Sequence, residues 1–212
     1  MTEYLLRIVV NEQQQDEKEQ TCNAVLSYLW AQGMPGATMR RGDAGIDELG
    51  VIWYDILEDS YYNNLPVIIE SVSNKSLIDK LEGGLREMVK HGQITLVKGL
   101  EESEISLHDH FVVKIYTKEN KKKIIDKKEH EKILSLLKEK KAIWATVTKG
   151  IAGYGKDHVI HNQHLFTLSE HMPLVIECVV EKENLDGLLL EIKEMAIDGI
   201  VFVVPVQVIK NN

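Results

Sequence analysis

The sequence of 212 residues is 27% charged and 44% hydrophobic, which excludes disordered, collagen-like and disulfide-rich proteins. Its net charge of −8 excludes non-specific binding of nucleic acid, because a polyanion requires a basic surface. No apolar run approaches the roughly 18 residues that a membrane-spanning helix needs, so we expect a cytoplasmic protein without direct membrane insertion.

Each half of the chain is predicted to alternate strands and helices. Alternating or continuous apolar residues indicate strands, and apolar residues three or four positions apart indicate helices. In the first half the order is strand, helix, strand, strand, helix, strand, over residues 4–10, 16–32, 36–41, 66–72, 77–88 and 93–98. The second half has the same order over residues 111–117, 126–140, 142–149, 174–180, 184–197 and 200–208. This order is typical of the βαββαβ ferredoxin-like sandwich, whose helices cover one face of an antiparallel sheet.

The two halves also share a sequence repeat. Several landmarks recur in the same order, each 107 or 108 residues after its first occurrence. They are Arg7–Glu12 with Lys114–Glu119, Ala37-Thr38 with Ala145-Thr146, Leu65–Glu70 with Met172–Glu177, and Glu87-Met88 with Glu194-Met195. Such self-similarity indicates a duplicated domain. We therefore predict an α+β protein of two tandem ferredoxin-like domains, residues 1–98 and 111–212, joined by a polar linker at 99–110.

One face of each predicted sheet needs a cover. Val201–Val204 are consecutive apolar residues, which is typical of a strand buried on both faces. The helices of a single βαββαβ unit cover only one of these faces. We therefore expect a homo-oligomer in which the sheets of several units face inward. Pro205 predicts that this last strand lies at a sheet edge.

The cysteines and tryptophans give packing predictions. Cys22 and Cys178 lack a C-x-x-C pairing, so we expect buried, reduced thiols rather than a disulfide bond or a zinc site. Trp30 and Trp144 fall within predicted elements, where we expect them in the core. Trp53 falls in a long connection, where it either packs beneath its own loop or contacts a protein partner.

Both halves contain a connection of roughly 20 residues between the second and third strands, at 42–65 and 150–172. Connections of this length are uncommon and are often functional. The second one begins with closely spaced glycines and a lysine: Gly150, Gly153, Gly155 and Lys156. Glycines of this kind allow backbone N–H groups to form an anion-binding nest, and Lys156 adds a positive charge. From these residues alone, the alternative is a flexible hinge.

The wider pattern resembles a known family. Ala-Thr-Val precedes the second connection, Met172–Glu177 opens the next strand, and Glu194-Met195-x-x-x-Gly199 ends the last helix. This pattern resembles the PII-like family catalogued as domain of unknown function 190 and, more distantly, the PII signalling proteins. The resemblance covers both halves, so the chain is similar to a tandem duplication of a domain that is usually single.

The resemblance implies a trimer with nucleotide clefts between subunits, at the base of the loop after the second strand. It implies that the ligand is contacted by Gly153, Tyr154, Gly155 and Lys156, and by Glu177 on the third strand. The expected ligand is an adenine nucleotide, and no cofactor is required. The PII likeness also implies a regulated partner protein.

The first copy departs from this pattern. Asp47 replaces the glycine that corresponds to Gly155, and Asp43 adds a negative charge. Residues 1–106 contain 9 basic and 18 acidic side chains, against 16 and 15 in residues 107–212. We therefore expect a degenerate first copy and a ligand in the second.

The phosphate-binding turn before the last strand, where the superfamily has glycine and lysine, is reduced in both copies. It reads His91-Gly92-Gln93 in the first and Asp198-Gly199 in the second, without a lysine. A nucleotide with one or two phosphates, or no nucleotide, therefore fits better than a triphosphate.

Three histidines in the second connection, His158, His161 and His164, provide an alternative function. Their spacing suits Zn²⁺ or Cu²⁺, but without a helix it does not fix a coordination geometry. A solvated loop that is rich in histidine is the other interpretation.

No catalytic constellation is recognisable, so an enzyme is the least supported class. We expect a regulatory protein that senses a small anion and transmits its presence through the second connection. The alternatives are a metal-binding module and a structural adaptor that contacts its partner through residues 42–65.

Overall fold

The computed structural model describes residues 2–16, 19–47, 49–55, 63–118, 129–162, 172–195 and 197–209. The chain divides into two compact units. Unit 1 contains Glu3–Val97 and Gly150–Ile160, and unit 2 contains Thr2, Lys98–Lys149 and His161–Asn212. The first unit therefore includes a segment of the second sequence repeat.

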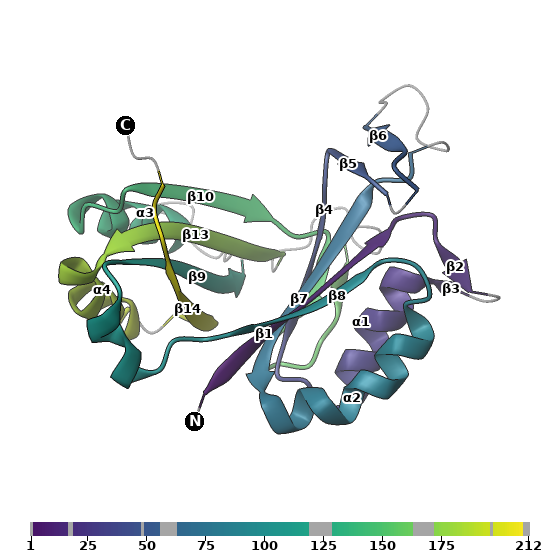
Figure 1. Ribbon diagram of the computed structural model, residues 1–212, viewed down its shortest axis with the longest axis horizontal. Helices are drawn as coiled ribbons and strands as arrows, with labels where there is room; N and C mark the ends of the chain where they lie inside the picture. Colours follow the sequence, from purple (N-terminus) through teal and green to yellow (C-terminus); the bar gives the residue numbers. More distant parts are fainter. Residues whose placement is uncertain are drawn as a thin grey trace. The chain divides into compact units, whose positions relative to one another are not determined.

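The first repeat forms an antiparallel sheet in the order β4-β7-β1-β8, with two helices on one face (Figure 1). The strands are β1 (Glu3–Asn11), β4 (Ala37–Arg41), β7 (Pro66–Asn74) and β8 (Gln93–Lys98). The helices are α1 (Thr21–Ala31) and α2 (Lys75–Met88). Two short hairpins lie outside this sheet, β2 (Gln15–Asp16) with β3 (Glu19–Gln20), and β5 (Ala44–Ile46) with β6 (Ile52–Tyr54).

The second repeat forms a sheet with the equivalent order, β10-β13-β9-β14. Its strands are β9 (His110–Lys118), β10 (Trp144–Lys149), β13 (Pro173–Glu181) and β14 (Ile200–Val206). Its helices are α3 (Glu129–Glu139) and α4 (Lys182–Glu194), and a 3-10 helix, η2 (Glu102–Leu107), lies in the predicted linker. The predicted fold class is therefore confirmed, and β14, which contains Pro205, lies at a sheet edge as expected.

Each unit has its own apolar core between its sheet and its helices. In unit 1, alternate residues of β1 such as Leu6, Ile8 and Val10 point into this core, and the intervening residues point to the other face. In unit 2, Val113 and Ile115 of β9 pack in the same way against the helices. Period-two burial thus produces the two-layer sandwich that the sequence pattern predicts.

A close backbone approach explains the glycine that precedes the last strand in each repeat. A Cβ atom on Gly92 would lie 2.4 Å from the carbonyl oxygen of Val9, and Gly92 has a φ of +132°. A Cβ atom on Gly199 would lie 2.0 Å from the carbonyl oxygen of Tyr116, the equivalent residue of β9. Only glycine fits at such distances, so the repeat conserves a physical requirement of the fold.

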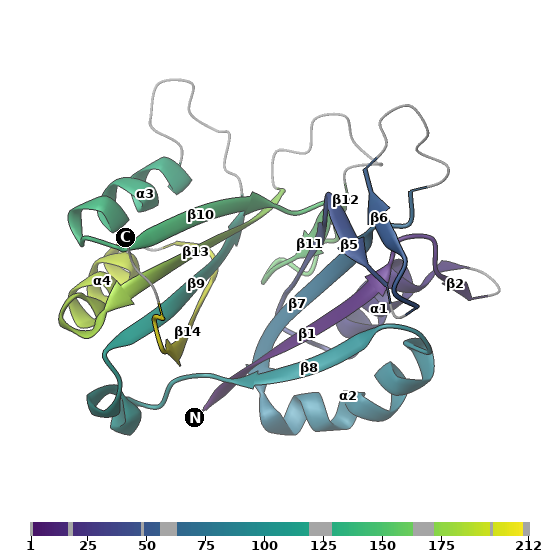
Figure 2. The same cartoon turned by 45° about the horizontal axis from the view of Figure 1, so that its top comes forward.

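The sheet of unit 1 is extended by two strands from the second repeat. These are β11 (Ala152–Tyr154) and β12 (His161–Asn162), and the full order is β12-β11-β4-β7-β1-β8 (Figure 2). The register pairs Ala152 with Met39, Gly153 with Thr38 and Tyr154 with Ala37. The start of the second long connection is therefore a strand of the first unit's sheet.

Some predicted elements differ in extent. Helix α1 begins at Thr21 rather than at residue 16, because the preceding residues form the β2–β3 hairpin. The start of the helix predicted over 126–140 lies outside the described residues. Glu101 and Glu104 cap η2 reciprocally, so the polar residues of the linker serve as helix caps.

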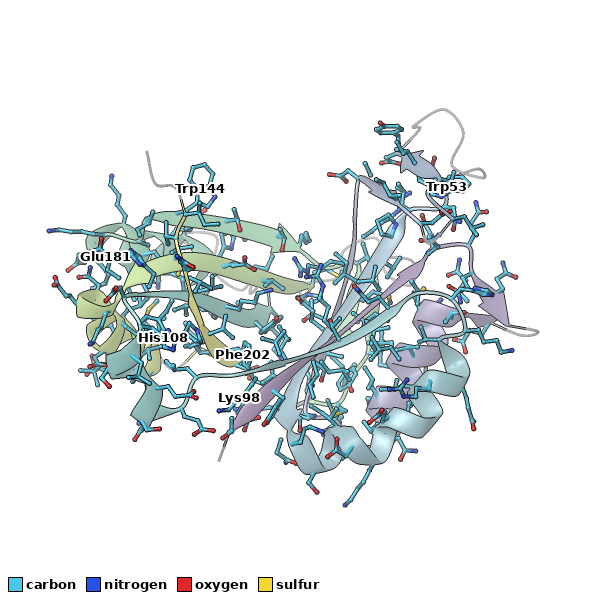
Figure 3. The ribbon with its side chains drawn as sticks, viewed as in Figure 1. Trp53, Lys98, His108, Trp144, Glu181 and Phe202 are labelled. Carbon is cyan, nitrogen blue, oxygen red and sulfur yellow. The ribbon has the colours of Figure 1, made fainter. Side chains whose placement is uncertain are left out.

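The cysteine prediction is confirmed, and the prediction that two tryptophans lie in the core is wrong. Cys22 and Cys178 are free and buried. Trp30 is 43% exposed because its indole N–H reaches out of α1 to the carbonyl oxygen of His158, at 2.7 Å. Trp144 is 70% exposed on the edge strand β10, and its ring stands away from the sheet (Figure 3).

Candidate ligand-binding site

The first part of the predicted glycine nest is used in strand pairing. Gly150 is buried just before β11, and the amide of Ile151 donates to the carbonyl oxygen of Met39 at 2.8 Å. Ala152 and Tyr154 are buried among the core residues of unit 1. This part of the connection is therefore held in the sheet, with the Ile151 N–H group already bonded.

The second part forms a tight turn at the surface. The amide of His158 donates to the carbonyl oxygen of Gly155 at 2.9 Å, and Lys156 is exposed between them. The rings of Tyr154 and His158 stack with centroids 6.3 Å apart, and Trp30 donates to the His158 carbonyl. Aromatic contacts thus fix the turn beside α1.

The tyrosine of this turn has an isolated polar group. Burial raises the pKa of Tyr154, and among the described residues its hydroxyl oxygen has no hydrogen-bond partner. The phenol is therefore neutral at physiological pH, and its buried hydroxyl does not hold an anion through charge.

Glu177 does not belong to the same unit as the glycine turn. It lies on β13 of unit 2, where it pairs with Lys114 at 3.0 Å. In unit 1 its counterpart is Glu70, which lies opposite Thr38 across β7 and β4, while Thr38 lies opposite Gly153. The structure thus places Gly153 in a cross-strand row with Glu70.

The row around Glu70 contains a buried ion pair. The Glu70 carboxylate is fully buried and accepts a hydrogen bond from the Arg40 guanidinium at 2.5 Å. Arg7 lies opposite Glu70 on the neighbouring strand, and its Nε atom is buried. This polar row lies on the sheet face away from the helices, because its residues alternate with those of the core.

A cavity of about 710 Å³ lies in unit 1, at the end of β1 and beside the β5–β6 hairpin. It joins the base of the first long connection to the glycine turn before the last strand. Its lining residues are Val9, Val10, Asn11, Gln13, Gln14, Ile46, Asp47, Leu49, Asn64, His91, Gly92 and Gln93. The sequence analysis does not predict this cavity, because it places the ligand in the second copy.

Side-chain amides dominate the polar lining of this cavity. Among the described lining residues, Asp47 is the single carboxylate, and there is no lysine or arginine. The amides also organise the wall, since the backbone amide of Gln13 donates to the Asn64 side chain at 3.0 Å. Amides both donate and accept, so this lining suits a polar ligand with few negative charges.

Asp47 has a structural role in the hairpin beside the cavity. Its carboxylate accepts hydrogen bonds from the Trp53 indole at 2.8 Å and from the amides of Leu49 and Val51, both at 2.9 Å. The hydrogen bond from Trp53, and then those from the backbone, lower the pKa of Asp47 below its ordinary value of 3.8. The acidic residue that replaces glycine thus closes the turn between β5 and β6.

A second cavity of about 450 Å³ lies between α2 and β8 in unit 1. The charged residues in its lining pair with each other, Lys75 with Asp79 and Arg86 with Glu82. Because each charge has a partner along α2, this cavity offers a ligand little electrostatic attraction.

The predicted metal ligands are only partly described. His158 and His161 belong to the described residues, whereas His164 lies outside them. In the described part of the chain, no three histidine, cysteine or acidic side chains are arranged so that they could hold a metal ion. Burial raises the pKa of Cys22 to about 11 and that of Cys178 to about 12, which disfavours thiolate chemistry at either position.

Within the described residues, no helix combines the length and the apolar character needed to cross a membrane.

Comparisons with known proteins find relatives among the UPF0166 proteins. The chain is 41% identical over 61 residues to a UPF0166 protein of Aquifex aeolicus, a match that covers 29% of this chain and 58% of the relative. It is 36% identical over 84 residues to a UPF0166 protein of Methanocaldococcus jannaschii, covering 40% of this chain and 76% of the relative. A solved structure of an unknown protein from Galdieria sulphuraria has a TM-score of 0.28 and 10% identity, covering 96% of this chain and 98% of that one.

The family comparison matches the chain twice. Residues 3–99 and 110–208 each match DUF190, described as "Uncharacterized ACR, COG1993". The two matches coincide with the two copies that form equivalent four-stranded sheets. The chain is therefore a tandem-repeat member of the PII-like DUF190 family.

Proposed function

We propose that this protein is a non-enzymatic regulatory protein that binds a small polar ligand in the 710 Å³ cavity of unit 1. The ligand that fits best is an adenine nucleotide with one or two phosphates. The observation that carries the proposal is the cavity itself, which connects the long β4–β7 connection to the glycine turn at Gly92.

The size and lining of the cavity support this ligand class. Small-molecule sites typically occupy about 300–1,000 Å³, and a nucleotide fits within this range. Asn11, Asn64 and Gln93 place carboxamides in the wall. A carboxamide can donate to one edge atom of adenine while it accepts from the exocyclic amine.

The charge of the lining limits the number of phosphates. Asp47 repels an anion, and the described lining has no lysine or arginine to compensate. The turn His91-Gly92-Gln93 likewise contains no lysine that could bind a phosphate. A nucleoside monophosphate or a cyclic nucleotide therefore fits better than a triphosphate.

The proposal moves the ligand from the second copy to the first. The alternative position for the ligand is the glycine segment of the second copy, formed by Gly150, Gly153, Tyr154, Gly155 and Lys156. It has less support, because the Ile151 amide already donates to Met39 and only the Gly155–His158 turn lies at the surface.

The cavity and the β5–β6 hairpin share residues, which provides a route for signal transmission. Ile46 and Asp47 line the cavity and also belong to the β5–β6 hairpin or its turn. The hairpin carries exposed apolar side chains at Ile46, Leu49, Val51, Ile52 and Tyr54. A ligand that contacts the cavity side of the hairpin therefore changes how this apolar surface is presented to a partner.

Isothermal titration with AMP, ADP, ATP and cyclic AMP tests the proposal. We expect AMP or a cyclic nucleotide to bind most tightly, and the double variant H91A/Q93A to weaken binding by about tenfold or more, since it removes polar contacts from the cavity wall. Both side chains are exposed, so the fold should tolerate their removal. K156A is the matched control and should bind as the unmodified protein does.

The variants separate the two positions. Loss of binding in K156A with normal binding in H91A/Q93A would assign the ligand to the Gly155–His158 turn. Absence of heat with every nucleotide at millimolar concentration would overturn the nucleotide proposal.

A further inference from the structure

We propose that the β5–β6 hairpin of one chain adds to the edge of β10 in a second copy of the chain. In this interface Ala44–Ile46 pairs antiparallel with Ala145–Val147. The proposal concerns the surface through which the protein assembles with itself, and it does not depend on the ligand.

The chain already contains one example of this interface. In unit 1, β11 lies between β12 and β4, so a hairpin from the second repeat extends the sheet of the first. Ile151 donates to Met39, and the core of unit 1 includes Tyr154. A long-connection hairpin of this family fold is thus able to complete the neighbouring sheet edge by β-augmentation.

The repeat identifies the reciprocal partners. Ala44-Gly45-Ile46 of β5 lies 108 residues before Ala152-Gly153-Tyr154 of β11, and Ala37-Thr38-Met39 lies 108 residues before Ala145-Thr146-Val147. Transferring the register of β11 and β4 places Ala44 opposite Val147, Gly45 opposite Thr146 and Ile46 opposite Ala145. The second copy of the chain is therefore the occupant with matching sequence and length.

In the described part of the chain, the free side of β5 and the edge of β10 are both without a neighbouring strand. Strand β5 pairs with β6 as β11 pairs with β12, and β10 pairs with β13 as β4 pairs with β7. Among the described strands, β10 lies at the edge of its sheet, and β5 has no neighbour besides β6. Each therefore has one remaining side for a further strand.

The exposure of equivalent residues differs between the filled and the unfilled edge. Tyr154 is 6% exposed, whereas its counterpart Ile46 is 70% exposed. Ala37 and Thr38 are buried, whereas Ala145 and Thr146 are exposed. These differences are those expected of one interface seen once with its partner and once without.

Trp144 adds an apolar anchor to the unfilled edge. In unit 1 the corresponding residue is Gly36, where an added Cβ atom would lie 3.2 Å from the carbonyl oxygen of Tyr154. By the same register, Trp144 would meet the end of β5 of the second copy, at Ile46. An indole of 70% exposure next to an isoleucine of equal exposure is typical of an interface centre.

The interface is head-to-tail, because each chain offers one hairpin and one edge. Such contacts produce closed rings when the rotation between copies closes, and fibres when it does not. Each chain contributes two sandwich units to a closed ring, so the ring contains an even number of such units. The expected trimer would contain six.

Sedimentation velocity over a concentration series tests the assembly. We expect concentration-dependent self-association that is weakened by about tenfold or more in I46D and in W144K, because each places a charge in an apolar strand contact. Both side chains are exposed in the free chain, so folding should be unaffected. The control is L190D, at an apolar position of α4 that is 58% exposed, and it should assemble normally.

Disulfide trapping tests the register. A mixture of I46C chains with A145C chains should form an intermolecular disulfide, because directly opposite residues have Cα atoms about 4.5–5.5 Å apart. A mixture of I46C with T146C should not, because neighbouring residues of a strand point to opposite faces. The native Cys22 and Cys178 are buried and should not compete.

The proposal is overturned if the protein is monomeric at all concentrations, or if I46D and W144K assemble as well as L190D. Preferential trapping of the I46C and T146C mixture would also overturn it.

Discussion

Two equivalent glutamates show how a repeat changes at the level of single residues. Glu70 and Glu177 occupy the same position of β7 and β13, yet the Glu70 side chain is fully buried and the Glu177 side chain is 42% exposed. Glu70 pairs with Arg40, whereas the position equivalent to Arg40 in the second repeat is Thr148. The sequence repeat reveals the equivalence, but the burial depends on neighbours that the repeat does not conserve.

This difference predicts unequal mutational effects. We expect E70Q to lower the free energy of unfolding by about 3 kcal/mol, because it leaves the charge of Arg40 without its buried partner. E177Q should change it by less than about 1 kcal/mol, because its pair with Lys114 is partly solvated. Denaturant unfolding of both variants measures the two effects, and equal values would contradict the structural assignment.

At the level of elements, the four-stranded sheets and their helices were predictable because period-two and period-3.6 patterns are local. The β5–β6 hairpin was not predictable, because it depends on the Asp47 side chain bonding to residues up to Trp53. From sequence, Asp47 is only a charge that opposes phosphate. Its interaction with an indole six positions later carries no periodic signal.

Asp47 also predicts how the hairpin responds to acid. The folded hairpin lowers the pKa of Asp47 below 3.8, so the carboxylate stabilises the hairpin fully above that pH. This stabilisation is lost as the pH falls through the lower, folded value. The NMR signal of the Trp53 indole proton should therefore be constant from pH 7 to about pH 4 and shift only below it.

The D47N variant is the control for this titration. It keeps an acceptor oxygen at the same position but has no proton to gain, so the Trp53 signal should no longer follow pH in the acid range. A titration of the Trp53 signal near neutral pH in the unmodified protein would be incompatible with the role assigned to Asp47.

At the level of the whole molecule, the sequence predicted the duplication. It did not predict that β11 of the second repeat joins the sheet of the first. Ala152 and Tyr154 give a short strand pattern, but the pattern does not identify β4, more than 100 residues away, as its partner. Pairing over such separations is decided by which edges the complete fold leaves open. For the same reason, the glycine pattern predicts an anion-binding nest, whereas in the structure the Ile151 amide donates to Met39.

Because β11 completes the sheet of unit 1, we predict that residues 1–98 alone form an incomplete unit. This fragment lacks β11, so the edge of β4 loses its neighbour and buried side chains such as Met39 become exposed. We expect the fragment to self-associate and to bind a fluorescent peptide of residues 149–160, as measured by anisotropy. A Y154D peptide should bind at least about tenfold more weakly, because it brings a charge into the core.

The path of the chain constrains how the two copies can diverge. Between β10 and β13 it leaves unit 2, supplies β11 to unit 1 and returns, so cleavage in the linker at 99–109 would leave the first sheet dependent on the second fragment. A gene split at that linker would yield two products that still require each other. The two products would become independent only if the first copy gained its own replacement for residues 150–160. The duplicated chain is therefore not easily divided into two single-domain proteins.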